Sequence, residues 1–169
     1  TYQTADGATN ASITTGNLPA GVTGIFSGGV FTIQGTPTEP GTFDYTVTTD
    51  GPCVNVSLSG SIVVNDDATL ALSSAPATDN QTVCINSPVT DITYTTGGGA
   101  TGVSITAGNL PAGVTGSFAD GIFTISGTPS ESGVFPYTIT TTGPCIPPAL
   151  SGTITVNANP VVNTIVDAA

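Results

Sequence analysis

Cysteine is the residue type in this sequence with the most versatile chemistry, and it occurs three times, at Cys53, Cys84 and Cys145. Cysteines form disulfide bonds, bind metal ions or stay as thiols buried in a core. Metal binding is disfavoured, because the sequence has no His and no Cys-x-x-Cys pair that would complete a zinc site. Disulfide bonds and buried thiols remain as the two alternatives.

The carboxylates offer two further kinds of chemistry, a metal site and an acid–base pair. Glu39 and Glu131 each follow a Gly-Thr-Pro turn and could form one half of a glycosidase pair. No second carboxylate recurs beside them, so exposed turn glutamates are the preferred interpretation. A Ser or Cys nucleophile would lack a His or Lys base, because the sequence has neither residue type. We therefore expect no catalytic residue, no enzyme activity and no cofactor.

All eleven charged side chains are carboxylates, which gives a formal net charge of −11 at pH 7. Nucleic-acid binding depends on Lys and Arg that neutralise phosphates, so neither nucleic acid nor an anionic membrane surface is an expected partner. The longest apolar runs, such as residues 62–64, are far shorter than the roughly 20 residues that span a bilayer. We expect no membrane insertion.

A nine-residue phrase, GNLPAGVTG, occurs at residues 16–24 and again at 108–116. When the sequence is displaced by 92 positions, 42 of the 65 pairs from Thr1/Thr93 to Asn65/Asn157 are identical. Self-similarity at a fixed period is typical of a tandem array in which each period is one folding unit. The chain is therefore interpreted as a piece of a longer array. The expected organisation is a repeat at 1–65 that lacks its opening strand, a complete repeat at 66–157 and the start of a third at 158–169.

The period assigns a place to each cysteine. Cys84 lies early in the complete repeat and Cys145 lies late, so we predict a Cys84–Cys145 disulfide within one unit. Cys53 is then expected to pair with a cysteine ahead of residue 1. Closing a loop of roughly 60 residues would stabilise such a unit by on the order of 4 kcal/mol in the loop-entropy model.

The same period bears on a candidate Ca²⁺ site. Asp66, Asp67 and Asp79 surround the junction between the repeats, where carboxylate oxygens could hold Ca²⁺. Positions 158 and 159, which align with Asp66 and Asp67, are Ala and Asn. A metal site required at every junction would keep its carboxylates. Solvated linker charges are the preferred interpretation, and no metal site is expected.

Four segments of the complete repeat alternate apolar with small polar residues, as a strand with one buried and one wet face does. They are residues 103–106, 122–125, 135–140 and 154–156. Clusters of Gly, Thr, Asp and Pro separate these segments, and no window holds a helical apolar stripe. The predicted fold is all-β, with each repeat an antiparallel β-sandwich of about seven short strands.

The repeated phrase itself predicts a sharp turn. Pro111 fixes its own φ and lacks a backbone donor, and Gly113 and Gly116 tolerate positive φ. Such a turn leaves Leu110 and Val114 free to point into the core.

Several short motifs recur in both copies and can be compared with known repeats. In the complete repeat they are LPAGV at 110–114, FTISGTP at 123–129, Gly133 and YTIT at 137–140, with counterparts at 18–22, 31–37, Gly41 and 45–48. Together they resemble the Ig-like tandem repeat of large bacterial surface proteins. The further phrases QTVCIN at 81–86 and TGPC at 142–145 are similar to the variant found in giant cell-surface adhesins of gliding Bacteroidetes.

The resemblance implies Ig-like modules, export by the type IX secretion route, a location on the cell surface, and adhesion to a substratum during gliding. We expect the modules to form the stalk of an exported filamentous adhesin. The expected partners are neighbouring repeats of the same chain, the secretion and gliding machinery, and a substratum or surface polysaccharide bound through other parts of the protein. The alternative is a module that binds polysaccharide itself, which would need exposed aromatic residues clustered on one face.

Overall fold

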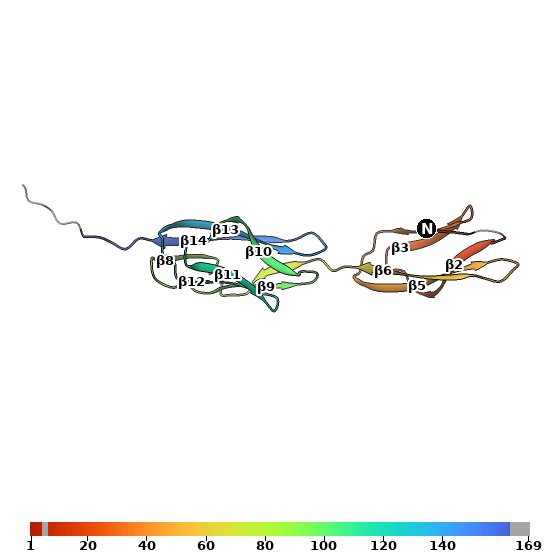
Figure 1. Cartoon of the computed structure of the whole chain (residues 1–169), viewed down its shortest axis with the longest axis horizontal. Coiled ribbons are helices and arrows are strands. Elements are labelled where there is room, and N and C mark those ends of the chain that lie inside the picture. The colour runs from red at the N-terminus through yellow and green to blue at the C-terminus, as the bar shows by residue number, and fades with distance from the viewer. Residues whose placement is uncertain (5–6, 163–169) are drawn as a thin grey trace, which may run out of the picture. The chain divides into compact units, whose positions relative to one another are not determined.

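The computed structural model describes residues 1–4 and 7–162, and the chain divides into unit 1, Thr1–Asp66, and unit 2, Asp67–Ala169. Every regular element in the described residues is a β-strand, as predicted (Figure 1). The described residues include no helix of the length and apolarity needed to cross a bilayer. Of the predicted third repeat, residues 158–162 form no strand, and 163–169 lie outside the described residues.

Unit 2 is a β-sandwich of two four-stranded sheets. The first sheet contains, in order, β11 (Val114–Ala119), β12 (Ile122–Gly127), β9 (Ile92–Gly97) and β7 (Thr69–Leu72). The second contains β10 (Gly102–Gly108), β13 (Gly133–Thr142), β14 (Ala149–Asn157) and β8 (Asn80–Cys84). This strand order is that of an Ig-like sandwich, so the predicted fold class is confirmed.

The opening strand of unit 2 is split between the two sheets, which the sequence pattern did not reveal. β7 pairs antiparallel with β9, and β8 pairs parallel with β14. The described part of unit 2 therefore has eight strands instead of about seven, and one pair is parallel. The split occurs at residues 73–79, where Pro76 and the positive φ of Ala77 (67°) turn the chain out of one sheet and into the other.

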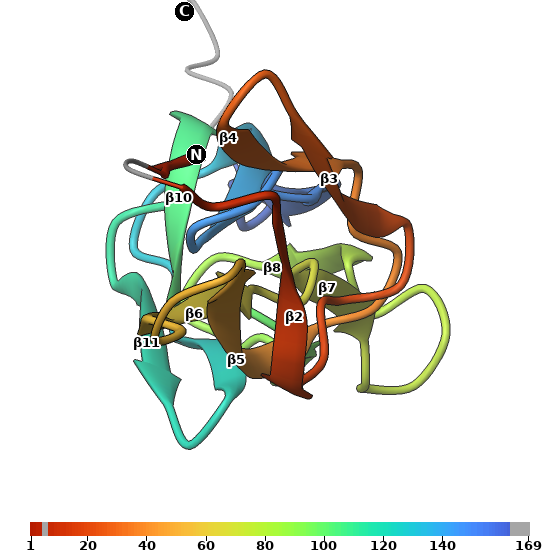
Figure 2. The same ribbon diagram turned by 90° about the vertical axis from the view of Figure 1, so that its right-hand side faces the viewer.

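Unit 1 repeats this architecture without counterparts of β7 and β8 in the described residues. One sheet contains β1 (Tyr2–Gln3), β4 (Val30–Gly35) and β3 (Val22–Ser27). The other contains β2 (Asn10–Gly16), β5 (Gly41–Asp50) and β6 (Ser57–Val64). Figure 2 shows β6, β5 and β2 in this order, facing the β3–β4 hairpin. As a result, β1 and β6 are edge strands.

The cores are built from the apolar positions of the predicted alternation. In unit 2 the core includes Ile92, Ile125, Ile139 and Ile154, all with no exposed surface. Each of the four segments predicted as strands lies within β10, β12, β13 or β14. Burial of these branched side chains from both sheets holds the sandwich together.

The LPAGV turn has the predicted effect on its apolar residues, with Val114 buried and Leu110 packed against the core. Gly113 takes φ 88°, as expected for the turn. Gly116 serves a different purpose, because a Cβ there would lie 2.5 Å from Cζ of Phe123. Glycine is needed at this position for the packing of the ring against the backbone.

Candidate functional site

The structure does not bring Cys84 and Cys145 together, as the predicted disulfide would require. Cys84 lies opposite Asn157 at the end of β14, whereas Cys145 lies in the β13–β14 connection that precedes Ala149. The eight residue steps from Ala149 to Asn157 correspond to roughly 26 Å of extended chain. A disulfide requires Cα atoms within about 7 Å. The sequence order of the two cysteines was known, but the parallel β8–β14 pairing that separates them was not.

The alternative of thiols buried in the core also fails for two of the cysteines. Cys53 and Cys84 are both exposed. Cys53 lies in the β5–β6 connection of unit 1, and its partner ahead of residue 1 stays a prediction.

The candidate Ca²⁺ ligands are not brought together. Asp66 and Asp67 are exposed in the connection between β6 and β7, and Asp79 directly precedes β8. The described part of the chain holds no group of three or more metal-ligating side chains. Asp79 contacts the second sheet through its backbone. Its carbonyl accepts hydrogen bonds from the Thr153 amide at 2.8 Å and from the Tyr137 hydroxyl at 3.4 Å.

Glu39 and Glu131 are exposed turn residues, as preferred from the sequence, and each side chain accepts a hydrogen bond from a neighbouring turn. Glu131 Oε1 accepts a hydrogen bond from the Ala112 amide at 2.7 Å, and Glu39 Oε1 accepts one from the Ala20 amide at 3.3 Å. Each glutamate thus joins its own turn to the LPAGV turn. These contacts explain why Glu recurs 92 positions apart without an acid–base partner.

A pair of tyrosine hydroxyls connects the two sheets in each unit. Tyr94 in β9 and Tyr137 in β13 have hydroxyl oxygens 2.9 Å apart, and those of Tyr2 and Tyr45 are 3.0 Å apart. Because Tyr137 donates its proton to the Asp79 carbonyl, Tyr94 is the donor within its pair. The recurrence of two tyrosines 43 residues apart was the sequence signal for this bridge, which sequence analysis had assigned only to the core.

The pKa of three tyrosines in these pairs, Tyr94, Tyr137 and Tyr45, is raised above the ordinary value. Desolvation is the main cause of the raised pKa of Tyr137 and Tyr94, and the nearby Asp79 carboxylate raises both further. In unit 1 the hydrogen bond to Tyr2, followed by desolvation, raises the pKa of Tyr45 to about 12. The bridge is therefore a neutral polar contact inside an apolar core.

The parallel β8–β14 ladder connects the first part of unit 2 to its last strand. Five residue pairs run from Asn80↔Thr153 to Cys84↔Asn157. The Ile85 amide extends the ladder by donating to the Asn157 carbonyl at 2.9 Å. The side-chain amide of Gln81 in β8 forms two hydrogen bonds with the backbone of Thr90. Its nitrogen donates to the Thr90 carbonyl and its oxygen accepts from the Thr90 amide, both at 2.9 Å.

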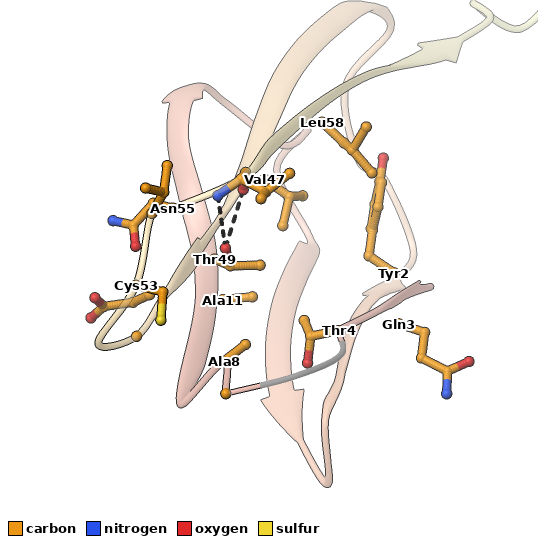
Figure 3. A pocket seen from close by; sticks show the side chains of 15 residues that line it. Tyr2, Gln3, Thr4, Ala8, Ala11, Val47, Thr49, Cys53, Asn55 and Leu58 are labelled. Carbon is orange, nitrogen blue, oxygen red and sulfur yellow. Dashed lines mark hydrogen bonds between the residues drawn. The ribbon is translucent and has the colours of Figure 1, made fainter.

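Unit 1 has an apolar groove of about 390 Å³. Its lining includes Ala11, Val47 and Leu58, with Tyr2 and Gln3 on one side and Cys53 and Asn55 on the other (Figure 3). Within it, Thr49 Oγ1 donates to the Val56 carbonyl at 3.3 Å and accepts from the Val56 amide at 3.0 Å. No charged group except Asp50 lines the groove in the described residues.

The equivalent hydroxyl in unit 2 has a different environment. Thr141 is 2 % exposed, and its Oγ1 has no hydrogen-bond partner among the described residues. The residue that corresponds to Val56 is Pro148, which has no N–H to donate. The N–H that donates to Thr49 Oγ1 in unit 1 therefore has no counterpart at Pro148 in unit 2.

The aromatic side chains do not form an exposed platform. All ten Tyr and Phe residues are buried or partly buried, and the chain has no Trp. The groove of unit 1 contains one aromatic residue, Tyr2. This is the pattern expected of structural aromatics instead of a sugar-stacking face.

Comparison with known proteins gives only distant structural similarity. No protein-family model and no curated protein matches the chain. It is similar to an endo-fucoidan hydrolase of glycoside hydrolase family 107, with 19 % identity over 89 % of the chain and a TM-score of 0.39, and spans about 23 % of that protein. It is also similar to titin domains Z1Z2 in complex with telethonin, with 11 % identity, coverage of 83 % of this chain and 74 % of that one, and a TM-score of 0.44. It is similar as well to domains 1–6 of the surface layer protein SbsC, with 17 % identity, coverage of 75 % of this chain and 18 % of that one, and a TM-score of 0.43.

Proposed function

We propose that the chain is a stalk segment of an exported, filamentous cell-surface adhesin, whose β-sandwich modules carry tension and supply length. The observation that carries the proposal is the parallel pairing of β8 with β14. The chain reaches β8 from its first strand and leaves unit 2 after β14. Tension on the two ends pulls β8 and β14 in opposite directions along their length, so that the pairs of the ladder resist together.

The absence of a recurrent chemical site supports the same function. What the two units share is scaffold: the tyrosine bridge, the glutamate contact to the LPAGV turn and the core positions. The described residues hold no clustered metal ligands. The carboxylate surface and the lack of Lys and Arg fit a module that stays apart from anionic surfaces and partners.

The proposal extends to the cell surface, to export by the type IX route and to gliding motility, all of which rest on the motif resemblance described above. The adhesive contact to a substratum or polysaccharide is then made by other parts of the protein. Direct polysaccharide binding by these modules is the less favoured function, because no exposed aromatic platform occurs among the Tyr and Phe residues.

Single-molecule stretching of the full chain by its termini tests the load-bearing function. Unit 2 should unfold in one event that releases on the order of 30 nm of chain, and unit 1 should release roughly 20 nm. Unit 1 should yield at a much lower force. Its first strand, β1, has only two ladder pairs, and its last strand, β6, has no parallel partner in the described residues.

A substitution in the ladder separates this mechanism from general stability. Val83→Pro places a residue without an N–H in the middle of β8 and should lower the unfolding force of unit 2 towards that of unit 1. Val134→Ala, at an exposed site on β13, is the matched control and should leave the force unchanged. An unfolding force of unit 2 that equals that of unit 1 in the unmodified chain would rule out the load-bearing function.

A further inference from the structure

One sheet of each unit ends in a regular strand of six residues. β11 ends the first sheet of unit 2, and β3 ends the corresponding sheet of unit 1. Each pairs with its inner neighbour over six consecutive positions without a register shift. No described strand pairs with the outer edge of either one, so the outward backbone groups are open to another strand. The edge recurs in both units and is present where both sheets have four strands.

The other edges of unit 2 each have a feature that hinders pairing with a further strand. β7 and β8 have only four and five residues, and β10 has a register shift between Ile105 and Ala107. Short strands and bulges protect a sheet edge, as do charged residues and prolines. β11 and β3 contain neither a charged residue nor a proline. These two edges therefore have none of the usual protection.

The edge of β11 is complementary to itself. When two copies meet antiparallel with Gly116 opposite Gly116, Val114 lies opposite Phe118 and Thr115 lies opposite Ser117. The members of each pair are on the same side of the sheet, because side chains alternate along a strand. Val114 and Phe118 both face the core. The two cores then lie on the same side of one continuous sheet.

The same pairing brings no like charges together. Asp120, the first carboxylate after β11, faces Ala112 of the other copy in this register. In unit 1, Gly24 opposite Gly24 places Thr23 against Ile25, which is 50 % exposed in the single chain. The pairing thus covers an apolar side chain that the unit leaves in solvent.

The recurrence of the edge indicates which partner fits it. β3 and β11 occupy equivalent positions 92 residues apart, so a partner that uses both must repeat with the same period. A second copy of the chain meets this requirement and presents edges of matching register. An unrelated strand would fill one edge and would leave its recurrence unexplained.

We propose that the chain associates with further copies of itself by antiparallel pairing of β11 with β11 and of β3 with β3. Each further repeat adds another pair of edges, so that weak contacts sum to stable association. This inference goes beyond the stalk function and does not depend on it. Its test applies no force, so association and load bearing can each fail alone.

Sedimentation and amide hydrogen exchange of the full chain over a range of concentrations test the proposal. A reductant prevents the exposed Cys53 and Cys84 from linking copies. An ionic strength of about 0.15 M screens the repulsion between negatively charged chains beyond about 8 Å. The mass should rise with concentration, and exchange in β3 and β11 should slow by at least ~10-fold once association is complete, because new ladder hydrogen bonds protect the amides. Exchange at the bulged edges, β2 and β10, should not change.

Charged residues on the edge should abolish association, because like charges directly opposite each other destabilise a strand pair. All substituted positions are exposed, and far-ultraviolet circular dichroism checks the fold of each variant. The edge variant combines Thr23→Asp, Ile25→Asp, Thr115→Asp and Ser117→Asp. The matched control has the same added charge on the bulged edges, as Ser12→Asp, Thr14→Asp, Ser104→Asp and Thr106→Asp, and should associate as the parent chain does.

Mixing two charged variants tests the register itself. A chain with lysine at the four edge positions should also stay monomeric alone. Mixed in equal amounts with the aspartate edge variant, it should form heterodimers, because each aspartate then faces a lysine of the other copy. A monomeric parent chain at every concentration would overturn the proposal, as would a mixture that does not associate. Protection that appears in β1 or β6 while β3 and β11 stay unprotected would overturn it as well.

Discussion

Units 1 and 2 share most of their residues but differ in how completely they bury them. Tyr137 and Ile139 of unit 2 are 1 % and 0 % exposed, whereas the corresponding Tyr45 and Val47 of unit 1 are 9 % and 5 % exposed. The strands common to both units pair in the same registers, as in β10–β13 and β2–β5, including the irregularity near the middle of each pair. The difference arises from β7 and β8.

The comparison teaches that two short strands complete both the core and the mechanical connection. β7 and β8 contain nine residues, yet they cover one edge of each sheet. The described residues of unit 1 include no counterparts of these strands, and there the apolar groove and the outer edges of β1 and β6 are uncovered. The three predictions that follow use matched substitutions in the two units to break or sharpen this comparison.

The largest effect is expected from a core isoleucine that both units contain. Ile154→Ala removes a side chain with no exposed surface and should lower the free energy of unfolding of unit 2 by about 2–5 kcal/mol. Ile62→Ala, at the partly buried counterpart in β6, should cost unit 1 less than half as much. Urea denaturation followed by far-ultraviolet circular dichroism, with hydrogen exchange to assign each transition, measures both. Equal losses would show that the missing strands do not govern burial.

Alkaline pH should destabilise unit 2 more than unit 1. A tyrosine whose pKa is raised in the folded state contributes its full stabilisation below pH 10, which is about the pKa of tyrosine in the unfolded chain. Below that pH the phenol is neutral in both the folded and the unfolded state. As pH rises above 10, the unfolded chain ionises and stability falls by about 1.4 kcal/mol per pH unit for each buried tyrosine. This loss continues to about pH 12 for Tyr45 and to higher pH for Tyr137 and Tyr94, whose raised pKa comes mainly from desolvation.

Tyrosinate absorbance recorded during alkaline unfolding provides the measurement. The tyrosines of unit 2 should ionise only as the unit unfolds. The double variant Tyr94→Phe with Tyr137→Phe should remove most of the pH dependence of unit 2, and Tyr2→Phe with Tyr45→Phe serves as the control in unit 1. Ionisation of Tyr137 in a folded unit 2 near pH 10 would contradict the prediction.

The smallest effect should have opposite signs in the two units. Thr141→Val removes a buried hydroxyl without a partner and should stabilise unit 2 by about 1 kcal/mol. Thr49→Val removes both hydrogen bonds to Val56 and should destabilise unit 1 by about 0.5–1 kcal/mol. Thermal denaturation of the two single variants tests this pair. Pro148→Val should restore a backbone N–H that can donate to Thr141 Oγ1. In that background Thr141→Val should destabilise unit 2, which distinguishes the loss of a hydrogen bond from the gain of a more apolar side chain.

The sequence by itself determined four strands of unit 2, the LPAGV turn and the apolar positions that form the core. Alternation over residues 122–125 and 135–140 was sufficient to place β12 and β13, because the side-chain direction in a strand depends only on position along the chain. The LPAGV turn and the inward direction of Val114 followed in the same way from Pro and Gly. These are local properties, and each copy of the repeat carries them within a few residues.

Only the tertiary structure decided which segments meet. The split of the opening strand at residues 73–79 places β8 parallel to β14, so that Cys84 and Cys145 lie at opposite ends of a strand instead of side by side. The hydrogen bond from Tyr137 to the Asp79 carbonyl depends on the same long-range pairing. The repeat period gives the order of these residues along the chain. Their distances depend on strand direction and register, which are settled only when distant strands pack and pair.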